Sequence, residues 1–121
     1  MKTILIIDDD EMFRKALGLT LTELGYKVVE ATNGKEGMEA YARQLVDLIM
    51  VDLIMPEKEG IETIIDIRKS QPSVKILAMS GGGRGSATGY LLAAKAFGAD
   101  RMLAKPFAND ELLAVLHELL P

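Results

Sequence analysis

The sequence predicts an α/β fold, a three-layer sandwich in which a doubly wound, five-stranded parallel sheet carries helices on both faces. Along the 121 residues, five short apolar runs alternate with segments of helical periodicity, which is typical of such sheets. The run 48–51 is apolar at every position, as expected for a central strand that is buried on both sides. For five strands the common order is 2-1-3-4-5, the flavodoxin-like arrangement.

The first half of the chain predicts three strands and two helices. Strands are expected at 3–7, 27–31 and 47–52, each rich in Ile, Val or Leu. The first helix is indicated by apolar residues at spacings of four, four and three, which are Phe13, Leu17, Leu21 and Leu24. Gly25 follows in the usual position after a helix end. The second helix begins after the turn at 32–34 and carries Met38, Tyr41, Ala42 and Leu45.

The second half predicts two further strands and three helices. A third helix, with Ile61, Ile64, Ile65 and Arg68, stops before Pro72. Strands are expected at 74–79 and 101–104, and the glycine-rich stretch 81–86 should form a flexible loop. A fourth helix is expected at 90–97, ended by Gly98, and a fifth helix is expected to have Asn109 as its N-cap.

Composition restricts the function classes that remain. The chain is 49% hydrophobic and 26% charged, which is ordinary for one globular domain spanning 1–121. Its formal net charge of −4 argues against nucleic acid as a partner. The absence of cysteine excludes disulfides and thiolate chemistry. The N-terminus resembles neither a signal peptide nor a membrane helix, so we expect a cytoplasmic protein without a membrane partner.

Three carboxylates should meet at one edge of the predicted sheet. In the order 2-1-3-4-5 the winding reverses between the first and third strands, and a ligand crevice opens at their carboxyl ends. The residues at those ends are Asp8, Asp9 and Asp52. Asp52 could instead simply bond its turn, and Asp10 could cap the first helix.

These acids and two further strand-end residues make a site suited to a phosphoryl group. Clustered carboxylates repel one another unless a cation neutralises them, and an all-oxygen set that leaves room for water favours Mg²⁺. Ser80 adds a hydroxyl and Lys105 an ammonium group at neighbouring strand ends. One carboxylate can then be the nucleophile while Lys105 and the cation offset charge on the transferring oxygens. Ser80 as a plain turn residue and Lys105 as a solvated charge are the alternatives.

The glycine triplet and the single histidine do not indicate a further functional site. The glycine triplet 81–83 is not followed by Gly-Lys-Ser/Thr, so a nucleotide P-loop is not indicated. His117 is placed on the last helix, away from the crevice, and we expect it at the surface.

Four motifs in order resemble the receiver domain of two-component response regulators over essentially the whole chain. They are Ile-Ile-Asp8-Asp9-Asp10, Asp52-Leu-Ile-Met55-Pro56 with Gly60, Ser80, and Lys105-Pro106-Phe107. The resemblance implies that Asp52 is the phosphoacceptor. It implies Mg²⁺ ligation by the pair Asp8 and Asp9, by Asp52 and by the backbone carbonyl of Ile54. Ser80 would be the switch hydroxyl, Lys105 would pair with the phosphoryl group, and the Lys105–Pro106 bond would be cis.

The chain departs from that family's pattern at three places. Met102 stands where a switch Phe or Tyr is often found, so an aromatic flip is missing or replaced. The loop that begins at Gly81 is about three residues longer than in many receivers. Ile54 and Gly82 occupy variable positions that often carry polar side chains. Since neither can position an attacking water, we expect a relatively long-lived aspartyl phosphate.

The resemblance implies a phosphorylation switch rather than a metabolic enzyme, one that catalyses only its own phosphorylation and dephosphorylation. The expected donor is a sensor histidine kinase or a phosphotransfer protein, and the output is read from the face formed by the fourth helix, fifth strand and fifth helix. We expect a stand-alone receiver, or one cut from a longer chain, that is a monomer or a phosphorylation-dependent dimer. The alternatives are a non-phosphorylated adaptor and an aspartyl phosphatase, although the latter usually carries an acid where Ile54 stands.

Overall fold

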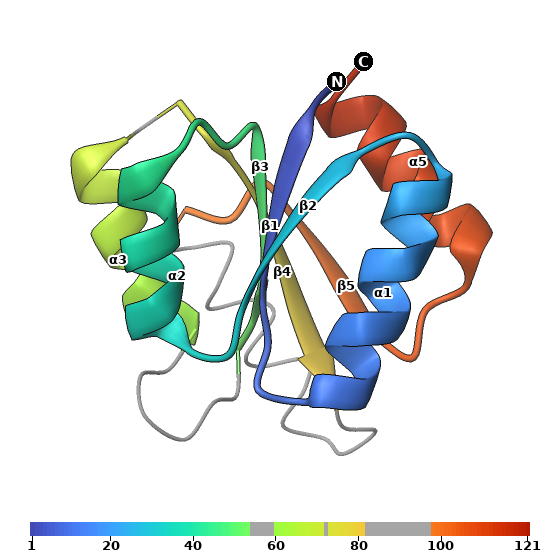
Figure 1. The fold of residues 1–121 in the computed structure, drawn as a ribbon, viewed down its shortest axis with the longest axis horizontal. Helices are drawn as coiled ribbons and strands as arrows, with labels where there is room; N and C mark the ends of the chain where they lie inside the picture. The colour runs from blue at the N-terminus through green and yellow to red at the C-terminus, as the bar shows by residue number, and fades with distance from the viewer. Residues whose placement is uncertain (54–59, 72, 82–97) are drawn as a thin grey trace.

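A computed structural model describes residues 1–53, 60–71, 73–81 and 98–121 of the chain. It contains one sheet with helices on both sides (Figure 1). The elements are β1 (Thr3–Ile7), α1 (Glu11–Glu23), β2 (Lys27–Ala31), α2 (Gly34–Arg43), β3 (Leu48–Asp52), α3 (Gly60–Ser70), β4 (Lys75–Gly81), β5 (Arg101–Lys105) and α5 (Asn109–Leu119). The helix expected at 90–97, the loop from Gly82 onward and Ile54 lie outside the described residues.

The strand order confirms the predicted topology. The sheet runs β2-β1-β3-β4-β5, with every neighbouring pair parallel. Ile7 pairs with Val51, so Asp8 leaves β1 directly beside the end of β3. Gly81 pairs with Lys105 at the ends of β4 and β5. Because parallel strands end at the same edge, the residues at their carboxyl ends are brought together there.

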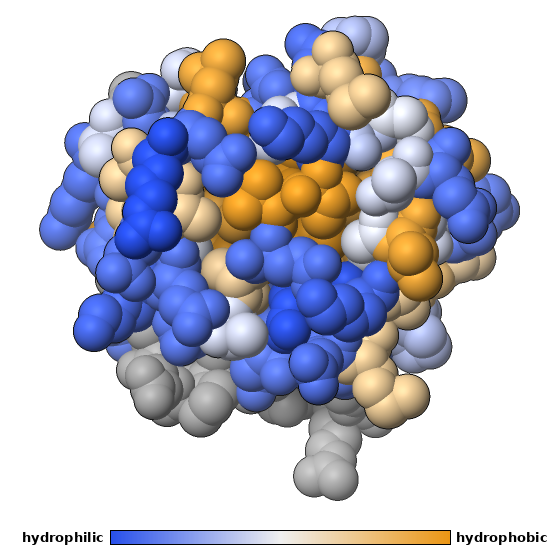
Figure 2. All heavy atoms as spheres, viewed as in Figure 1, coloured by the Kyte–Doolittle hydropathy of each residue, from blue (hydrophilic) through white to orange (hydrophobic). Residues whose placement is uncertain are grey.

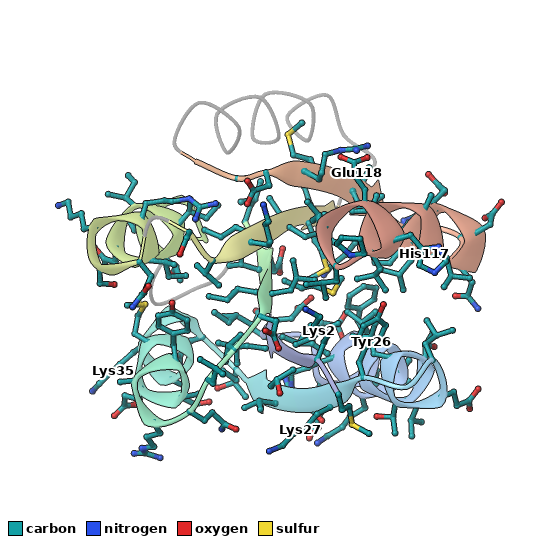
Figure 3. All side chains as sticks on the ribbon, turned by 90° about the horizontal axis from the view of Figure 1, so that it is seen from above. Lys2, Tyr26, Lys27, Lys35, His117 and Glu118 are labelled. Atoms are coloured by element: carbon teal, nitrogen blue, oxygen red, sulfur yellow. The ribbon has the colours of Figure 1, made fainter. Side chains whose placement is uncertain are left out.

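Two cores hold this sheet between the helices, one on each face (Figure 3). The α1–α5 core consists of Ile4, Ile6, Leu17, Leu21, Leu48, Met50, Leu77, Met79, Leu103, Leu112, Val115, Leu116, Leu119 and Leu120. The α2–α3 core consists of Leu5, Ile7, Ala31, Val46, Ile49, Val51, Leu53, Ile64, Ile67, Val74, Ile76, Ala78 and Ala99. Successive strand residues alternate between the two cores, as the period of two in a strand requires.

Burial makes the two central strands firm supports for the polar residues at their carboxyl ends. All five residues of β1 and all five of β3 are buried. Each fully buried Leu or Ile side chain contributes about 1.5–3 kcal/mol relative to an exposed one. The carboxyl ends of β1 and β3 are therefore among the best anchored points of the chain.

The first helix begins and ends where its sequence predicts. Asp10 is the N-cap, and its Oδ1 accepts a hydrogen bond of 3.1 Å from the N–H of Phe13. Gly25 has φ +98°, a conformation that L side chains rarely adopt. The N–H groups of Gly25 and Tyr26 donate to the carbonyls of Thr22 and Leu21, which is the Schellman ending of a helix.

The second helix has a cap that includes an acidic side chain. Asn33 is its N-cap and accepts from the N–H of Glu36. The Glu36 carboxylate in turn accepts from the N–H and the hydroxyl of Thr32. These two hydrogen bonds lower the pKa of Glu36 below its ordinary value.

Some sequence-based details were wrong. Leu45 is not part of the helical stripe, because α2 ends at Arg43, Gln44 is extended, and the Leu45 side chain is exposed. Asn109 is the first residue of α5 rather than its cap; the N-cap is Ala108, whose N–H donates to Glu111 Oε1. Strand β4 covers Lys75–Gly81 and β5 covers Arg101–Lys105, so Ser80 and Lys105 belong to the strands rather than following them.

On the face that carries the edge strand β2, hydrophobic side chains gather in the middle and hydrophilic ones surround them (Figure 2). Val28 and Val29 of β2 are half-buried, while Lys27 and Glu30 on the same strand are more exposed. Charged residues at such an edge discourage pairing with another strand. Within the described ranges, no helix is long and apolar enough to span a membrane.

Candidate functional site

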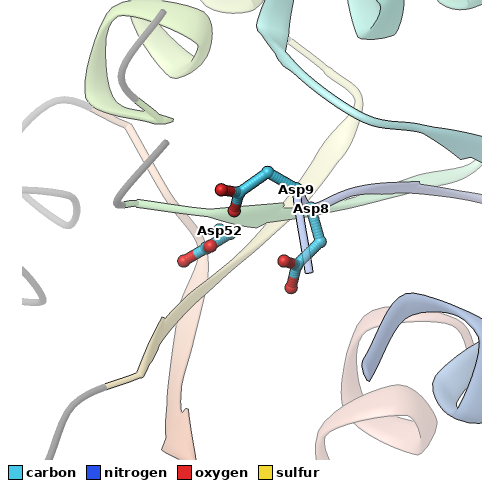
Figure 4. A group of neighbouring side chains, drawn as sticks. All are labelled: Asp8, Asp9 and Asp52. Atoms are coloured by element: carbon cyan, nitrogen blue, oxygen red, sulfur yellow. The ribbon is translucent and has the colours of Figure 1, made fainter. Parts of the chain in front are cut away.

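Three carboxylates converge at the carboxyl ends of β1 and β3 (Figure 4). One oxygen from each of Asp8, Asp9 and Asp52 lies within 4.8 Å of the other two. Asp8 and Asp52 are buried, and Asp9 is exposed. The structure thus brings together the three acids that the predicted strand order places at this edge, with one side of the group open to solvent.

Asp8 is held by contacts to each of its polar groups. Its N–H donates to the carbonyl of Ala31 at 3.1 Å, which ties it to the end of β2. Its Oδ1 accepts from the N–H of Asp10 at 2.9 Å, and its Oδ2 accepts from Lys105 Nζ at 2.6 Å. Since the side chain is completely buried, these bonds supply the pairing that a buried charge requires.

Arg14 is a buried cation that the sequence-based reasoning overlooked. Its Nη1 donates to the carbonyl of Asp8 at 2.8 Å, and its Nε pairs with Glu30 Oε1 at 2.9 Å. The signal was present in the sequence: Arg14 lies three residues before Leu17 and so falls on the buried stripe of α1. Arg14 links β2 to the residue that succeeds β1.

Lys105 lies between two of the acids and an aromatic ring. Its Nζ is 2.6 Å from Asp8 Oδ2 and 3.7 Å from Asp52 Oδ2. The same nitrogen is 4.1 Å from the centroid of the Phe13 ring. Only 13% of the Lys105 side chain is exposed, so the solvated-charge alternative is wrong.

Ser80 presents a buried hydroxyl near the end of β4. The residue is completely buried, and its Oγ finds no hydrogen-bond partner among the residues that the structure describes. An unpaired buried hydroxyl costs about 1–3 kcal/mol. The Ser80 hydroxyl can therefore accept or donate a hydrogen bond that the described residues do not supply.

Ser80→Ala is expected to raise the free energy of unfolding by about 1 kcal/mol, because it removes an unpaired buried oxygen without opening a large cavity. Urea unfolding of both proteins measures this. Ser70→Ala is the control, since Ser70 is exposed and its hydroxyl makes only weak bonds of 3.3 Å within its own helix. A clear loss of stability in Ser80→Ala would show that the hydroxyl is satisfied in solution.

Gly60 supports the backbone of Asp52 from the start of α3. An alanine Cβ there would lie 2.3 Å from the Asp52 carbonyl oxygen and 2.6 Å from Leu53 Cα. The Gly60 N–H donates to the Leu53 carbonyl at 3.2 Å, and the Leu53 N–H donates to the Met79 carbonyl. The absence of a side chain at Gly60 lets α3 approach the end of β3 this closely.

Of the remaining candidate residues, Pro106 and Gly81 lie at the same edge, whereas Met102 is the second residue of β5. The peptide bond between Lys105 and Pro106 is cis, as the resemblance implied. Met102 is half-buried and packs against the α2–α3 core. Gly81 is the last residue of β4. His117 is exposed on α5, as expected (Figure 3).

The donor set fits a hard divalent cation. Three carboxylates and the Lys105 ammonium carry formal charges of −3 and +1, which leaves −2. Ligand oxygens around octahedral Mg²⁺ are about 3 Å apart when adjacent and about 4 Å apart when opposite, given Mg–O bonds of about 2.1 Å. The carboxylate oxygens, within 4.8 Å of one another, need only small side-chain movements to reach that geometry. Asp9, which is exposed, has room for such a movement.

A cavity of about 470 Å³ lies at the opposite edge of the sheet. Its lining includes Tyr41, Asp47 and Val74, which precede or flank the amino ends of the strands. Partial burial raises the pKa of Tyr41. The chemistry of the acid cluster is indicated by its charges and by the distances between its carboxylates.

Comparison with known proteins finds matches over nearly the whole chain. Residues 4–117 match the family described as response regulator receiver domain. The chain is 36% identical to the chemotaxis protein CheY of Thermotoga maritima, covering 98% of this chain and 97% of that protein. It is 37% identical to the response regulator MprA of Mycobacterium leprae and 35% identical to the transcriptional regulatory protein GlrR of Escherichia coli. Both matches include 97% of this chain, but they correspond to only 50% of the length of MprA and 26% of the length of GlrR.

Solved structures show the same fold. The response regulator protein TrrA from Thermotoga maritima, in complex with Mg²⁺-BeF, superposes with a TM-score of 0.89 at 32% identity, covering 99% of this chain and 100% of that one. A receiver domain protein from Clostridium thermocellum gives a TM-score of 0.91 at 23% identity, covering 99% and 94%, and that likeness concerns the fold alone. With the four motifs, the strand order and these matches in agreement, the chain belongs to the response regulator receiver domain family.

Proposed function

We propose that this receiver domain is a phosphorylation switch in which Asp52 accepts a phosphoryl group in a Mg²⁺-dependent step. The observation that carries the proposal is the grouping of three carboxylates within 4.8 Å, with the Lys105 ammonium 3.7 Å from Asp52. A nucleophile, a place for a divalent cation and a fixed positive charge are the parts that phosphoryl transfer needs.

In the proposed step an oxygen of Asp52 attacks phosphorus, the new P–O bond forms an acyl phosphate, and the bond to the donor breaks. Burial at the end of β3 fixes the direction of the attacking carboxylate. Asp8, Asp9, Asp52 and the carbonyl of Ile54 would hold Mg²⁺, and Ile54 lies outside the described residues. When bound, Mg²⁺ neutralises charge on the phosphoryl oxygens. The complex of TrrA with Mg²⁺-BeF supports this choice of metal.

Lys105 and Ser80 are proposed to bind the phosphoryl group once it is attached to Asp52. The Lys105 ammonium, already between Asp8 and Asp52, can pivot to a phosphoryl oxygen. Ser80 Oγ, buried and without a partner in the described chain, gains an acceptor in that group. Each new charge-assisted hydrogen bond favours the phosphorylated arrangement. Gly81 follows Ser80 and Pro106 follows Lys105 directly in the chain, and Met102 lies on the same strand as Lys105. All three are proposed to move with the two site residues.

The partners follow from the same proposal. The donor is a sensor histidine kinase or a phosphotransfer protein, and the output protein senses the face that includes β5 and α5. This chain spans about half of the regulator MprA and about a quarter of the regulator GlrR. An output domain like those in the rest of these two proteins is therefore only a proposal for this chain. The net charge of −4 favours protein partners over nucleic acid for this domain, as a monomer or a phosphorylation-dependent dimer.

The test is intact mass after incubation with acetyl phosphate, with and without Mg²⁺. We expect a Mg²⁺-dependent gain of one phosphoryl group that is abolished in Asp52→Asn. Asp110→Asn, which changes an exposed carboxylate on α5, is the matched control and should be labelled like the wild type. Labelling of Asp52→Asn to the wild-type extent would place the acceptor elsewhere. No labelling of the wild type would favour the adaptor function and direct the work to partner capture.

A further inference from the structure

We propose that Phe13 is a positioning residue for Lys105, holding the ammonium group against its ring face beside Asp52. The proposal rests on the proposed phosphorylation of Asp52 and deepens it, because it explains how the cation that faces the phosphoryl group is kept in place. The signal is the distance of 4.1 Å from Lys105 Nζ to the Phe13 ring centroid. A cation this close to an aromatic face is attracted by the ring quadrupole.

Among the described residues, the ring adds an apolar neighbour to the charged neighbours of the ammonium group. Asp8 Oδ2 at 2.6 Å and Asp52 Oδ2 at 3.7 Å provide anionic partners, and the Phe13 ring provides an apolar one. With 13% of the side chain exposed, Lys105 has little contact with water. Electrostatic attraction to the ring is therefore stronger than it would be at an open surface.

Phe13 is itself held firmly. It lies in the first turn of α1, where its N–H donates to the capping Asp10. Its ring meets that of Phe107 at a centroid distance of 5.8 Å and an interplanar angle of 85°, an edge-to-face arrangement that aromatic pairs favour. Both rings pack against the α1–α5 core. Lys105, Phe13 and Phe107 thus form a cluster of contacts that joins the end of β5 to α1.

This contact suits a cation that must change its partner during the reaction. A hydrogen bond to Asp8 is directional, so it restrains Nζ when the ammonium group turns to a phosphoryl oxygen. Attraction to a ring face is broad, so it persists while the ammonium pivots across that face. The Phe13 ring also lines a groove of about 140 Å³, together with Phe107 and residues of α1 and α5. A smaller side chain at position 13 would widen this groove beside Lys105 and let its ammonium group turn toward solvent.

A role in packing alone would predict a different pattern of mutant effects. Any side chain of similar size would then serve at position 13, and the charge distribution of the ring would not matter. Fluorination of the ring changes its quadrupole with little change in shape. Site-specific incorporation of phenylalanine analogues with one, two and three ring fluorines at position 13 therefore separates the two roles.

The experiment measures the phosphorylation rate of the whole chain with saturating acetyl phosphate and Mg²⁺. We expect the rate to fall stepwise along the fluorine series and to fall about three- to tenfold in Phe13→Leu. Phe13→Tyr, which keeps an aromatic face, should stay within about twofold of the wild type. Phe107→Leu is the control for packing, because it removes the ring that braces Phe13 but leaves the ring that faces Lys105. Thermal unfolding of every variant identifies any that lose the fold.

Proton NMR of the Lys105 ε-methylene group gives a second readout that does not depend on phosphorylation. Ring current from Phe13 should shift these protons upfield, and Phe13→Leu should remove the shift. A flat rate along the fluorine series in a wild type that is labelled at Asp52 would overturn this proposal alone. An unshifted ε-methylene signal in the wild type would overturn it too. Failure of the wild type to be labelled would overturn the proposed function together with it.

Discussion

Replacing Gly60 with alanine is expected to lower the free energy of unfolding by about 2–3 kcal/mol and to slow phosphorylation of Asp52. The added Cβ would meet the carbonyl oxygen of Asp52 at 2.3 Å and Leu53 Cα at 2.6 Å. These are backbone atoms at the end of a buried strand, so they cannot turn aside as the end of a side chain can. Overpacking of this kind typically costs about 1–3 kcal/mol.

Two other glycines provide matched controls. Gly18→Ala, inside α1, places its Cβ 3.6 Å from the nearest atoms and should raise stability by about 0.5–1 kcal/mol through the better helix propensity of alanine. Gly37→Ala meets the terminal atoms of the Ile7 side chain and should have an intermediate effect. Urea unfolding measures the free energy of unfolding of the three alanine variants and so ranks them. If Gly60→Ala proved as stable as the wild type, α3 would have to approach β3 less closely in solution.

Replacing Arg14 with methionine is expected to lower the free energy of unfolding by about 2–3 kcal/mol. The change leaves the carbonyl of Asp8 without its 2.8 Å hydrogen bond and Glu30 without its closest cation. Removing one partner of a buried ion pair costs about 3–5 kcal/mol. The expected cost is smaller because 28% of the Glu30 side chain is exposed and Lys15 remains 3.2 Å from it.

Lys15→Met is the control for Arg14, since both cations contact the same carboxylate oxygen of Glu30. Lys15 is 59% exposed, so its loss should change stability by less than about 0.5 kcal/mol. The stability loss in Arg14→Lys should lie between those of Arg14→Met and Lys15→Met. One ammonium group cannot bridge Glu30 and the Asp8 carbonyl as a guanidinium does. Equal effects of the two methionine variants in urea unfolding would show that burial of Arg14 adds nothing.

Much of the site could be predicted from the sequence because its positions follow from backbone periodicity. A strand buried on both faces gives a continuous apolar run, and the run ends where the polar site begins. The ends of the runs that form β1 and β3 therefore predict that Asp8 and Asp52 lie side by side, and the register of the two strands confirms it. Ser80 and Lys105 followed from the same rule, although both proved to be the last or nearly the last residues within their strands.

The errors lie where local signals compete with tertiary packing. Asn109 has the composition of an N-cap, yet Ala108 takes that position and Glu111 accepts its N–H. Leu45 continued an apolar pattern, but the extended Gln44 ends α2 and leaves Leu45 in solvent. Element boundaries depend on how the next strand joins the sheet, which short-range propensity does not describe.

The sequence by itself determined the α/β class, the strand order and the edge at which the acids, hydroxyl and ammonium group gather, since all of these follow from the order and polarity of the strands. Only the tertiary structure decided which other residues contact these site residues and fix their positions. Arg14 reaches Asp8 from another element, Phe13 faces Lys105 from 92 positions earlier in the chain, and Gly60 touches the backbone of Asp52. Such contacts depend on side-chain direction and on distances between packed elements, and neither is set by periodicity along the chain.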